Sequence, residues 1–239
     1  MSTSETTRNS TADFLTFIDV LQGRAASYRM FSRLFLKPLT DEDIEELAAM
    51  DLINRALELK DCGLLSEGFN DMGRGLRKRN TGTRQSLSSD YTMCFDGVAT
   101  TNDEVAVPYA SIFLGEKALF NQEPRNEVFK IFCAENVGVK SSVHLPEDHL
   151  SFELEFLAML SERSVVAIEA NDISELRRNL ELSATFIRDH IQSWIGMLAE
   201  RANKLLSTRF YIGVMKATQG YLSLDLETIA DMLEELGDE

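Results

Sequence analysis

The chain has only three cysteines and four prolines in 239 residues. Cys62, Cys94 and Cys133 are odd in number and widely spaced, a pattern that fits neither a disulfide framework nor a zinc site. We therefore expect reduced thiols in or near the core.

Long apolar runs are absent as well. No stretch approaches the roughly 18 apolar residues that a helix needs to span a bilayer. Residues 1–11 contain no apolar segment of the kind found in a secretory signal peptide. The sequence therefore predicts a cytoplasmic protein without stable membrane insertion.

Basic residues are fewer than acidic ones. Lys and Arg number 24 against 39 Asp and Glu, which gives a net charge of −15. Such a charge repels nucleic acid phosphates and anionic membrane surfaces, so we expect no nucleic acid partner. A basic partner is compatible with this charge, and so is a simple role in solubility.

The pattern of apolar residues lacks the two-residue alternation of strands, and no internal repeat is evident. Intervals of three and four residues dominate every long apolar segment, and 44% of the residues are hydrophobic. These features predict an all-α, single-domain helical bundle of about nine to eleven helices. We expect residues 1–12 to form a flexible N-terminal segment and residues 13–239 to form one all-helical domain.

Several helix boundaries can be predicted from particular residues. The apolar face from Phe14 to Phe35 predicts one helix, and Thr40 is expected to cap the next. Gly138 is expected to end a later helix with a left-handed cap. Gly196 predicts a break in the long apolar stretch after residue 172, and Asp225 predicts the start of a short terminal helix.

Enzymatic signatures are weak. The segment Gly68–Gly75 has the glycine spacing of a phosphate-binding loop but lacks the Lys and Ser/Thr that hold phosphate and magnesium. His149 and Glu153 lie four residues apart on one predicted helix face, but two metal ligands are too few. We expect no metal and no cofactor. A metal- or nucleotide-dependent enzyme that uses residues 147–149 remains the alternative.

The most site-like cluster is Pro146-Glu147-Asp148-His149, which directly precedes an apolar helical run. Pro146 ends the preceding structure, and the two acids lie where the positive end of the helix dipole is expected. On local evidence alone, ordinary helix capping is the favoured explanation of the acids. If the cluster lines a cleft, Asp148 or Glu147 can hold a guanidinium group through two hydrogen bonds.

A second segment, Pro108-Tyr109-x-Ser111, lies thirty to forty residues upstream. Together with residues 147–149, it resembles the signature of the TorD/DmsD/NarJ family of cytoplasmic chaperones for molybdenum redox enzymes. The resemblance covers the chain from about Phe14 to Phe210. It implies an all-helical protein, not an enzyme, that binds the twin-arginine signal peptide of its client.

The resemblance also implies a client and a site. The partner would be the precursor of a molybdenum-containing oxidoreductase, whose cofactor insertion and maturation the chaperone assists before export; the chaperone itself could be a monomer or a dimer. The equivalents of Pro146, Asp148 and His149 line the peptide cleft in the family, and Tyr91 is our choice for its aromatic residue. Local sequence places Asp148 and His149 at an exposed helix start. The predicted peptide-binding residues are Tyr91, Phe95, Pro146, Glu147, Asp148, His149 and Glu153.

Overall fold

The computed structural model describes residues 3–100, 105–115, 123–139 and 144–237, with side chains described from residue 15 onward. The α-helices are α1 (Thr3–Leu36), α2 (Asp41–Ala49), α3 (Leu52–Glu58), α4 (Gly63–Leu76), α5 (Thr83–Cys94), α6 (Ala110–Leu114), α7 (Glu123–Ala134), α8 (Leu150–Glu169), α9 (Ile173–Phe186), α10 (Gln192–Leu205) and α11 (Arg209–Glu235). A π-helical segment, η1 (Ile187–Ile191), joins α9 to α10. These ranges contain no strand, so the predicted all-α bundle is confirmed.

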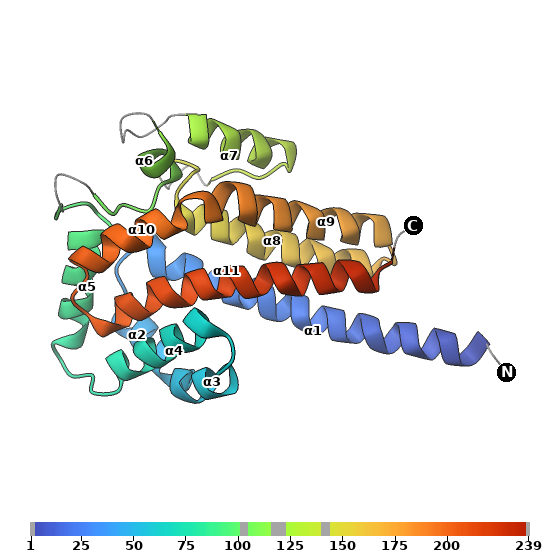
Figure 1. Cartoon of the computed structure of the whole chain (residues 1–239), viewed down its shortest axis with the longest axis horizontal. Helices are drawn as coiled ribbons and strands as arrows, with labels where there is room; N and C mark the ends of the chain where they lie inside the picture. Colours follow the sequence, from blue (N-terminus) through green and yellow to red (C-terminus); the bar gives the residue numbers. More distant parts are fainter. Residues whose placement is uncertain (1–2, 101–104, 116–122, 140–143, 238–239) are drawn as a thin grey trace.

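The long helices α1, α8, α9 and α11 run roughly lengthwise through the molecule (Figure 1). The most extensive helix contacts are those of α4 with α11 and of α1 with α8. Helices α2 to α5 gather at one end, whereas α6 and α7 lie on the opposite side of the bundle (Figure 1). No helix in the described ranges is long and apolar enough to cross a membrane.

Helix α1 supplies a large part of the core. Its side chains Leu21, Tyr28 and Phe31 are fully buried, as the three- and four-residue spacing predicts. The helix begins at Thr3 and therefore includes most of residues 1–12, of which 1–2 lie outside the described residues. A separate N-terminal segment stays a prediction.

A buried ion pair ties α1 to the middle of α11. The guanidinium of Arg24 donates to both carboxylate oxygens of Asp225, over 2.5 and 2.9 Å, and the Tyr28 hydroxyl donates to the same carboxylate over 2.5 Å. The prediction that Asp225 starts a terminal helix is therefore wrong. Asp225 lies inside α11 instead, and Arg24, 201 residues earlier, makes burial of its carboxylate tolerable.

Helix ends follow local chemistry in some places and not in others. Thr40 caps α2 in a capping box with Asp43, as expected. Gly138 does not end α7. Asn136 takes the left-handed conformation instead, with φ of 54°, and the amide of Val137 donates to the carbonyl of Phe132 over 2.8 Å. The break expected at Gly196 is also wrong, because the irregularity lies earlier, in η1.

Glycines allow α4 and α11 to approach closely. A Cβ atom at Gly68 would lie 2.3 Å from the backbone nitrogen of Ala217, and one at Gly220 would lie 2.2 Å from that of Leu65. Real Cβ atoms do not tolerate such distances. The glycine spacing that resembled a phosphate-binding loop thus includes a helix-packing position.

We predict that Gly220→Ala lowers the free energy of unfolding by about 1–3 kcal/mol, because the added methyl group forces α4 and α11 apart. Gly196→Ala is the matched control. Nothing lies within 4 Å of a Cβ atom at this helical position, so this change should stabilise the chain by about 0.5–1 kcal/mol. Urea denaturation measures both values, and equal effects of the two changes would contradict the packing argument.

Candidate functional site

The two sequence motifs form one structural unit. Tyr109 and His149 form an isolated antiparallel bridge. On either side of it, the amide of Ala110 donates to the carbonyl of Asp148 over 3.1 Å, and the amide of Leu150 donates to that of Pro108 over 2.9 Å. The rings of Tyr109 and His149 also meet edge to face, with their centroids 4.7 Å apart. The segment before α6 is therefore fixed against the start of α8.

Asp148 strengthens this junction from the interior. Its side chain is fully buried, and one carboxylate oxygen accepts hydrogen bonds from the amide and the hydroxyl of Ser111, the former over 2.8 Å. Burial raises the pKa of Asp148, and the two Ser111 hydrogen bonds oppose that rise. The carboxylate therefore acts as an internal acceptor that joins the two motifs.

His149 caps α8. Its Nδ1 atom accepts a hydrogen bond from the amide of Ser151 over 3.1 Å, which requires an unprotonated Nδ1. Burial lowers the pKa of His149 to about 3, so the imidazole is neutral at physiological pH. The expectation of an exposed helix start is wrong for Asp148 and His149, because the segment with Tyr109 covers them.

Glu153, one turn into α8, is fully buried, and neither of its carboxyl oxygens has a hydrogen-bond partner among the described residues. Burial raises its pKa well above the ordinary value, and the negative charge of Asp148 adds to this rise. The protonated, neutral form is therefore favoured.

Pro146 and Glu147 lie in the loop before α8 and are half-buried. One carboxylate oxygen of Glu147 accepts from Nε of Arg125 over 2.6 Å. The carboxylate that the sequence offered to an incoming guanidinium thus has a partner on α7.

A groove opens beside the first turns of α8. This α8 groove has a volume of about 460 Å³ and lies between α1, α8, the end of α7 and the segment that follows α7. Its lining is mainly apolar: Leu36, Phe132, Val137, Gly138, Val139, Phe152, Phe156 and Met159, with Arg29, Ser32, Ser151, Glu155 and Glu162 as its polar members. The hydroxyl groups of Ser32 and Ser151 are 2.9 Å apart and join α1 to α8 at the groove.

Sequence reasoning missed this groove, although a signal was present. Phe152, Phe156 and Met159 recur at intervals of four and three along α8, and Glu155 and Glu162 lie seven residues apart on the same helix. An apolar stripe that carries two regularly spaced acids can meet a ligand that is both apolar and basic.

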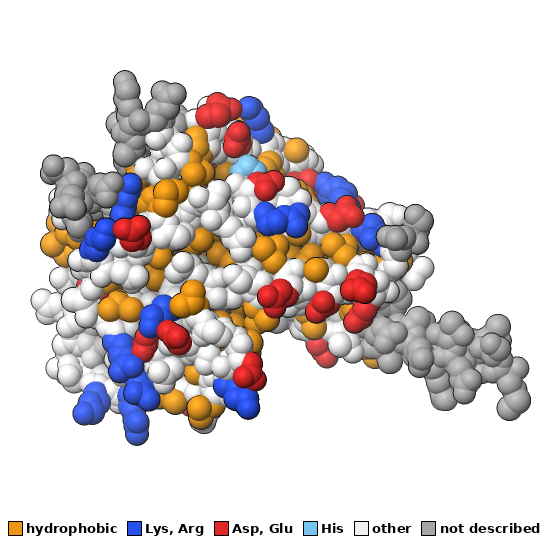
Figure 2. Space-filling view, viewed as in Figure 1, with side chains coloured by type: hydrophobic (Ala, Val, Ile, Leu, Met, Phe, Trp, Pro, Cys, Tyr) orange, Lys and Arg blue, Asp and Glu red, His pale blue; other side chains and the backbone are white. Residues whose placement is uncertain are grey.

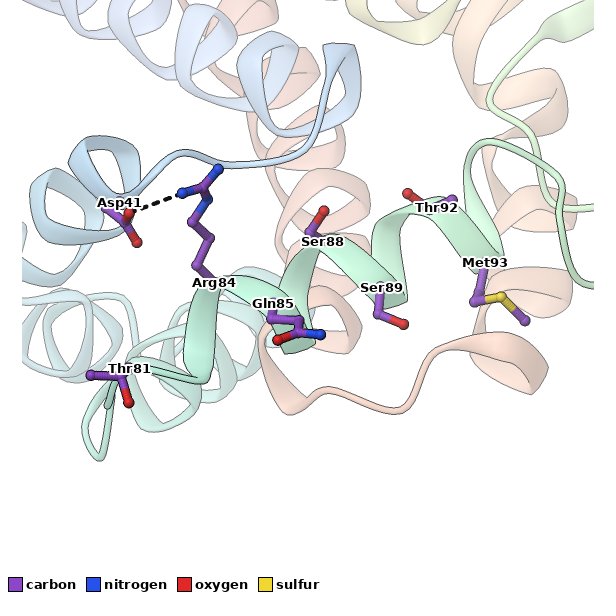
Figure 3. A pocket seen from close by; sticks show the side chains of 8 residues that line it. All are labelled: Asp41, Thr81, Arg84, Gln85, Ser88, Ser89, Thr92 and Met93. Atoms are coloured by element: carbon purple, nitrogen blue, oxygen red, sulfur yellow. Dashed lines mark hydrogen bonds and ion pairs between the residues drawn. The ribbon is translucent and has the colours of Figure 1, made fainter.

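A larger hollow, of about 570 Å³, lies against α5 (Figure 3). It is lined by Asp41, Thr81, Arg84, Gln85, Ser88, Ser89, Thr92 and Met93. Asp41, its single acidic lining residue, pairs with Arg84 over 3.2 Å. Polar and apolar surface contribute about equally to this hollow, whereas the lining of the α8 groove is mainly apolar, so the groove suits an apolar ligand better.

Charge is unevenly distributed over the molecule. Lys and Arg side chains gather at the end where α2 to α5 lie, at the lower left of Figure 2. Arg74, Arg77, Lys78, Arg79 and Arg84 are all exposed there. This basic end is distinct from the lining of the α8 groove.

Known proteins match most of the chain. The sequence profile of the family described as nitrate reductase delta subunit matches residues 58–200. The chaperone protein TorD of Vibrio atlanticus (strain LGP32) is 25% identical over 207 residues, covering 87% of this chain and 94% of the relative. TorD of Vibrio cholerae serotype O1 (strain M66-2) is 26% identical over 215 residues, covering 89% of this chain and 94% of the relative.

The chain belongs to this TorD/NarJ family. It is a redox enzyme maturation chaperone and not an enzyme. The family resemblance inferred from the two motifs is thereby confirmed.

Two predicted site residues of this TorD-family chaperone lie in the core. Tyr91 and Phe95 are 2% and 3% exposed. The Tyr91 hydroxyl donates to the carbonyl of Phe35 over 2.8 Å, and both rings contact Tyr211. The structure thus brings Asp148, His149 and the start of α8 together, whereas Tyr91 and Phe95 belong to an aromatic cluster between α1, α5 and α11.

The part of the chain that the structure describes contains no set of side chains that could bind a metal ion. No three His, Cys, Asp or Glu side chains there are grouped closely enough to hold an ion. His149 uses Nδ1 to cap α8, and Asp148 uses one oxygen on Ser111. In this TorD-family chaperone, His149 and Asp148 thus form hydrogen bonds that stabilise the fold.

We predict that Glu153→Gln raises the melting temperature at pH 8 and changes it little near pH 4. In the folded chain the pKa of Glu153 lies well above its ordinary value of 4.5. Above pH 4.5 the unfolded chain releases a proton that the folded chain retains, so the stability of the native protein falls as pH rises. Glutamine has no proton to release.

Thermal unfolding at the two pH values checks this prediction. His149 contributes equally to both proteins, so its own titration cancels in the comparison. A difference in melting temperature that is the same at pH 4 and pH 8 would contradict a raised Glu153 pKa.

Proposed function

We propose that this TorD-family chaperone binds the twin-arginine signal peptide of a molybdenum-containing oxidoreductase precursor in the α8 groove. Binding takes place in the cytoplasm and accompanies cofactor insertion and maturation before export. The observation that carries this proposal is the groove itself, where an apolar wall and two carboxylates occur together. A leader of this kind combines paired arginines with an apolar stretch.

The chemistry of the two partners is complementary. Phe152 and Met159 offer apolar surface to the apolar part of the leader. Glu155 and Glu162 lie two turns apart, about 10 Å along α8, and each carboxylate can accept two parallel hydrogen bonds from one guanidinium group. The net charge of −15 also favours the approach of a basic peptide.

A binding wall keeps its shape only if the residues beneath it are held in place, and we propose that the motif residues do this. His149 caps the turn that carries Ser151 and Phe152, two residues of the groove. Asp148 anchors that turn to Ser111. We therefore assign these two residues to positioning of the groove wall.

The remaining predicted site residues fit the same role. Pro146 and Glu147 shape the loop that leads into α8, and Glu153, Tyr91 and Phe95 are buried. We propose that these five residues support the groove from the loop and the interior, and that the peptide itself contacts the groove lining.

Calorimetry with a leader peptide tests the function. The peptide is taken from the oxidoreductase precursor that co-purifies with the chaperone. Replacing both arginines by alanine should lower the affinity roughly tenfold or more, since hydrogen bonds to charged groups contribute about 1.5–3 kcal/mol. The mature client domain alone should bind less tightly than the leader. Equal affinity for the native and the alanine peptide would contradict the electrostatic argument.

Three substitutions test whether the peptide binds at the α8 groove. Phe152→Ala should lower the affinity about tenfold, because a buried phenylalanine contributes about 1.5–3 kcal/mol. Phe129→Ala is the matched control, since Phe129 is 44% exposed on α7 and does not line the groove. Asp148→Ala should lower the melting temperature and the affinity together, as expected of a positioning residue.

A further inference from the structure

Both carboxylates of the α8 groove already hold a guanidinium group, that of Arg29 on α1. Nε of Arg29 is 3.3 Å from Oε1 of Glu155, and its Nη1 is 2.5 Å from Oε1 of Glu162. All three side chains line the groove. One arginine of the chain therefore bridges the two acids that an arginine-bearing ligand would use.

The bridge is exposed to solvent. The side chains of Arg29, Glu155 and Glu162 are 45%, 51% and 49% exposed. The hydrogen bond from Arg29 lowers the pKa of Glu162, which keeps this carboxylate ionised and ready to accept. Exposed ion pairs of this kind contribute little to stability, because water screens them. A second guanidinium can therefore replace Arg29 at small cost.

We propose that Arg29 is an internal competitor that occupies the arginine-binding carboxylates of the free chaperone and leaves them when a leader binds. The inference rests on the proposed function and adds a residue that sets specificity. A ligand must donate to these carboxylates with better geometry than Arg29 already does. Paired arginines meet this condition, because each guanidinium forms two parallel hydrogen bonds, whereas lysine is a point charge on a flexible stem.

Arg79, on another part of the surface, offers a comparison for Arg29. Arg79 also forms an exposed pair, with Glu45, through two hydrogen bonds of 2.7 Å each; the two side chains are 37% and 63% exposed. That pair lies outside the α8 groove. Arg79 therefore provides a control with the same chemistry and the same charge but no access to the proposed ligand site.

The test compares Arg29→Gln with Arg79→Gln by calorimetry, using the native leader and its double-alanine form. Arg29→Gln should bind the native leader up to about fivefold more tightly than the unaltered chaperone, which corresponds to the free energy of one exposed ion pair. It should bind the alanine peptide with unchanged affinity. Arg79→Gln should leave both affinities unchanged, although it makes the same change in net charge.

The outcomes separate the two proposals. If the unaltered chaperone prefers the native leader but Arg29→Gln binds it equally or more weakly, the competitor role is wrong and the proposed function stands. If the unaltered chaperone binds the native and alanine peptides equally, the proposed function fails and the inference fails with it. A gain for Arg29→Gln that extends to the alanine peptide would also overturn the inference, since the carboxylates would not be its cause.

Discussion

The junction between residues 108–111 and residues 148–150 is the constraint on which the α8 groove, the proposed binding site, depends. Two loops that would otherwise face solvent exchange backbone hydrogen bonds, and Asp148 accepts two more from Ser111. A buried carboxylate without partners is costly, so these contacts fix both loops at once. Because α8 begins at this junction, the position of the groove wall is set there.

Helix α8 and its cap carry ionisable residues of two kinds, buried and exposed. His149 and Glu153 are turned into the protein, where burial favours their neutral forms. Glu155 and Glu162 are turned outward and carry charge beside the apolar groove. The start of the helix therefore places uncharged groups in the core, and its outer face places carboxylates beside the groove, as the 3.6-residue period allows.

The sequence was sufficient to predict those features of the fold that depend on local patterns. The apolar period gave the long first helix, and Thr40 marked the start of α2. Local patterns could not predict contacts between distant residues. Asp225 is buried with Arg24, which donates hydrogen bonds to it, and Asp148 is buried with Ser111, which does the same. Charged residues near a predicted helix start look exposed until the partner is known. The α8 groove was missed for the same reason, since three separate segments form it.

The location of the bound leader tests the central claim most directly. A leader peptide with a photoreactive group in its apolar stretch can be cross-linked to the chaperone, and the labelled residues can be identified by mass spectrometry. The account predicts labels on residues 137–139 and on the groove face of α8, around Phe152 and Met159. Labels confined to the outward face of α5, around Ser89 and Met93 (Figure 3), would contradict it.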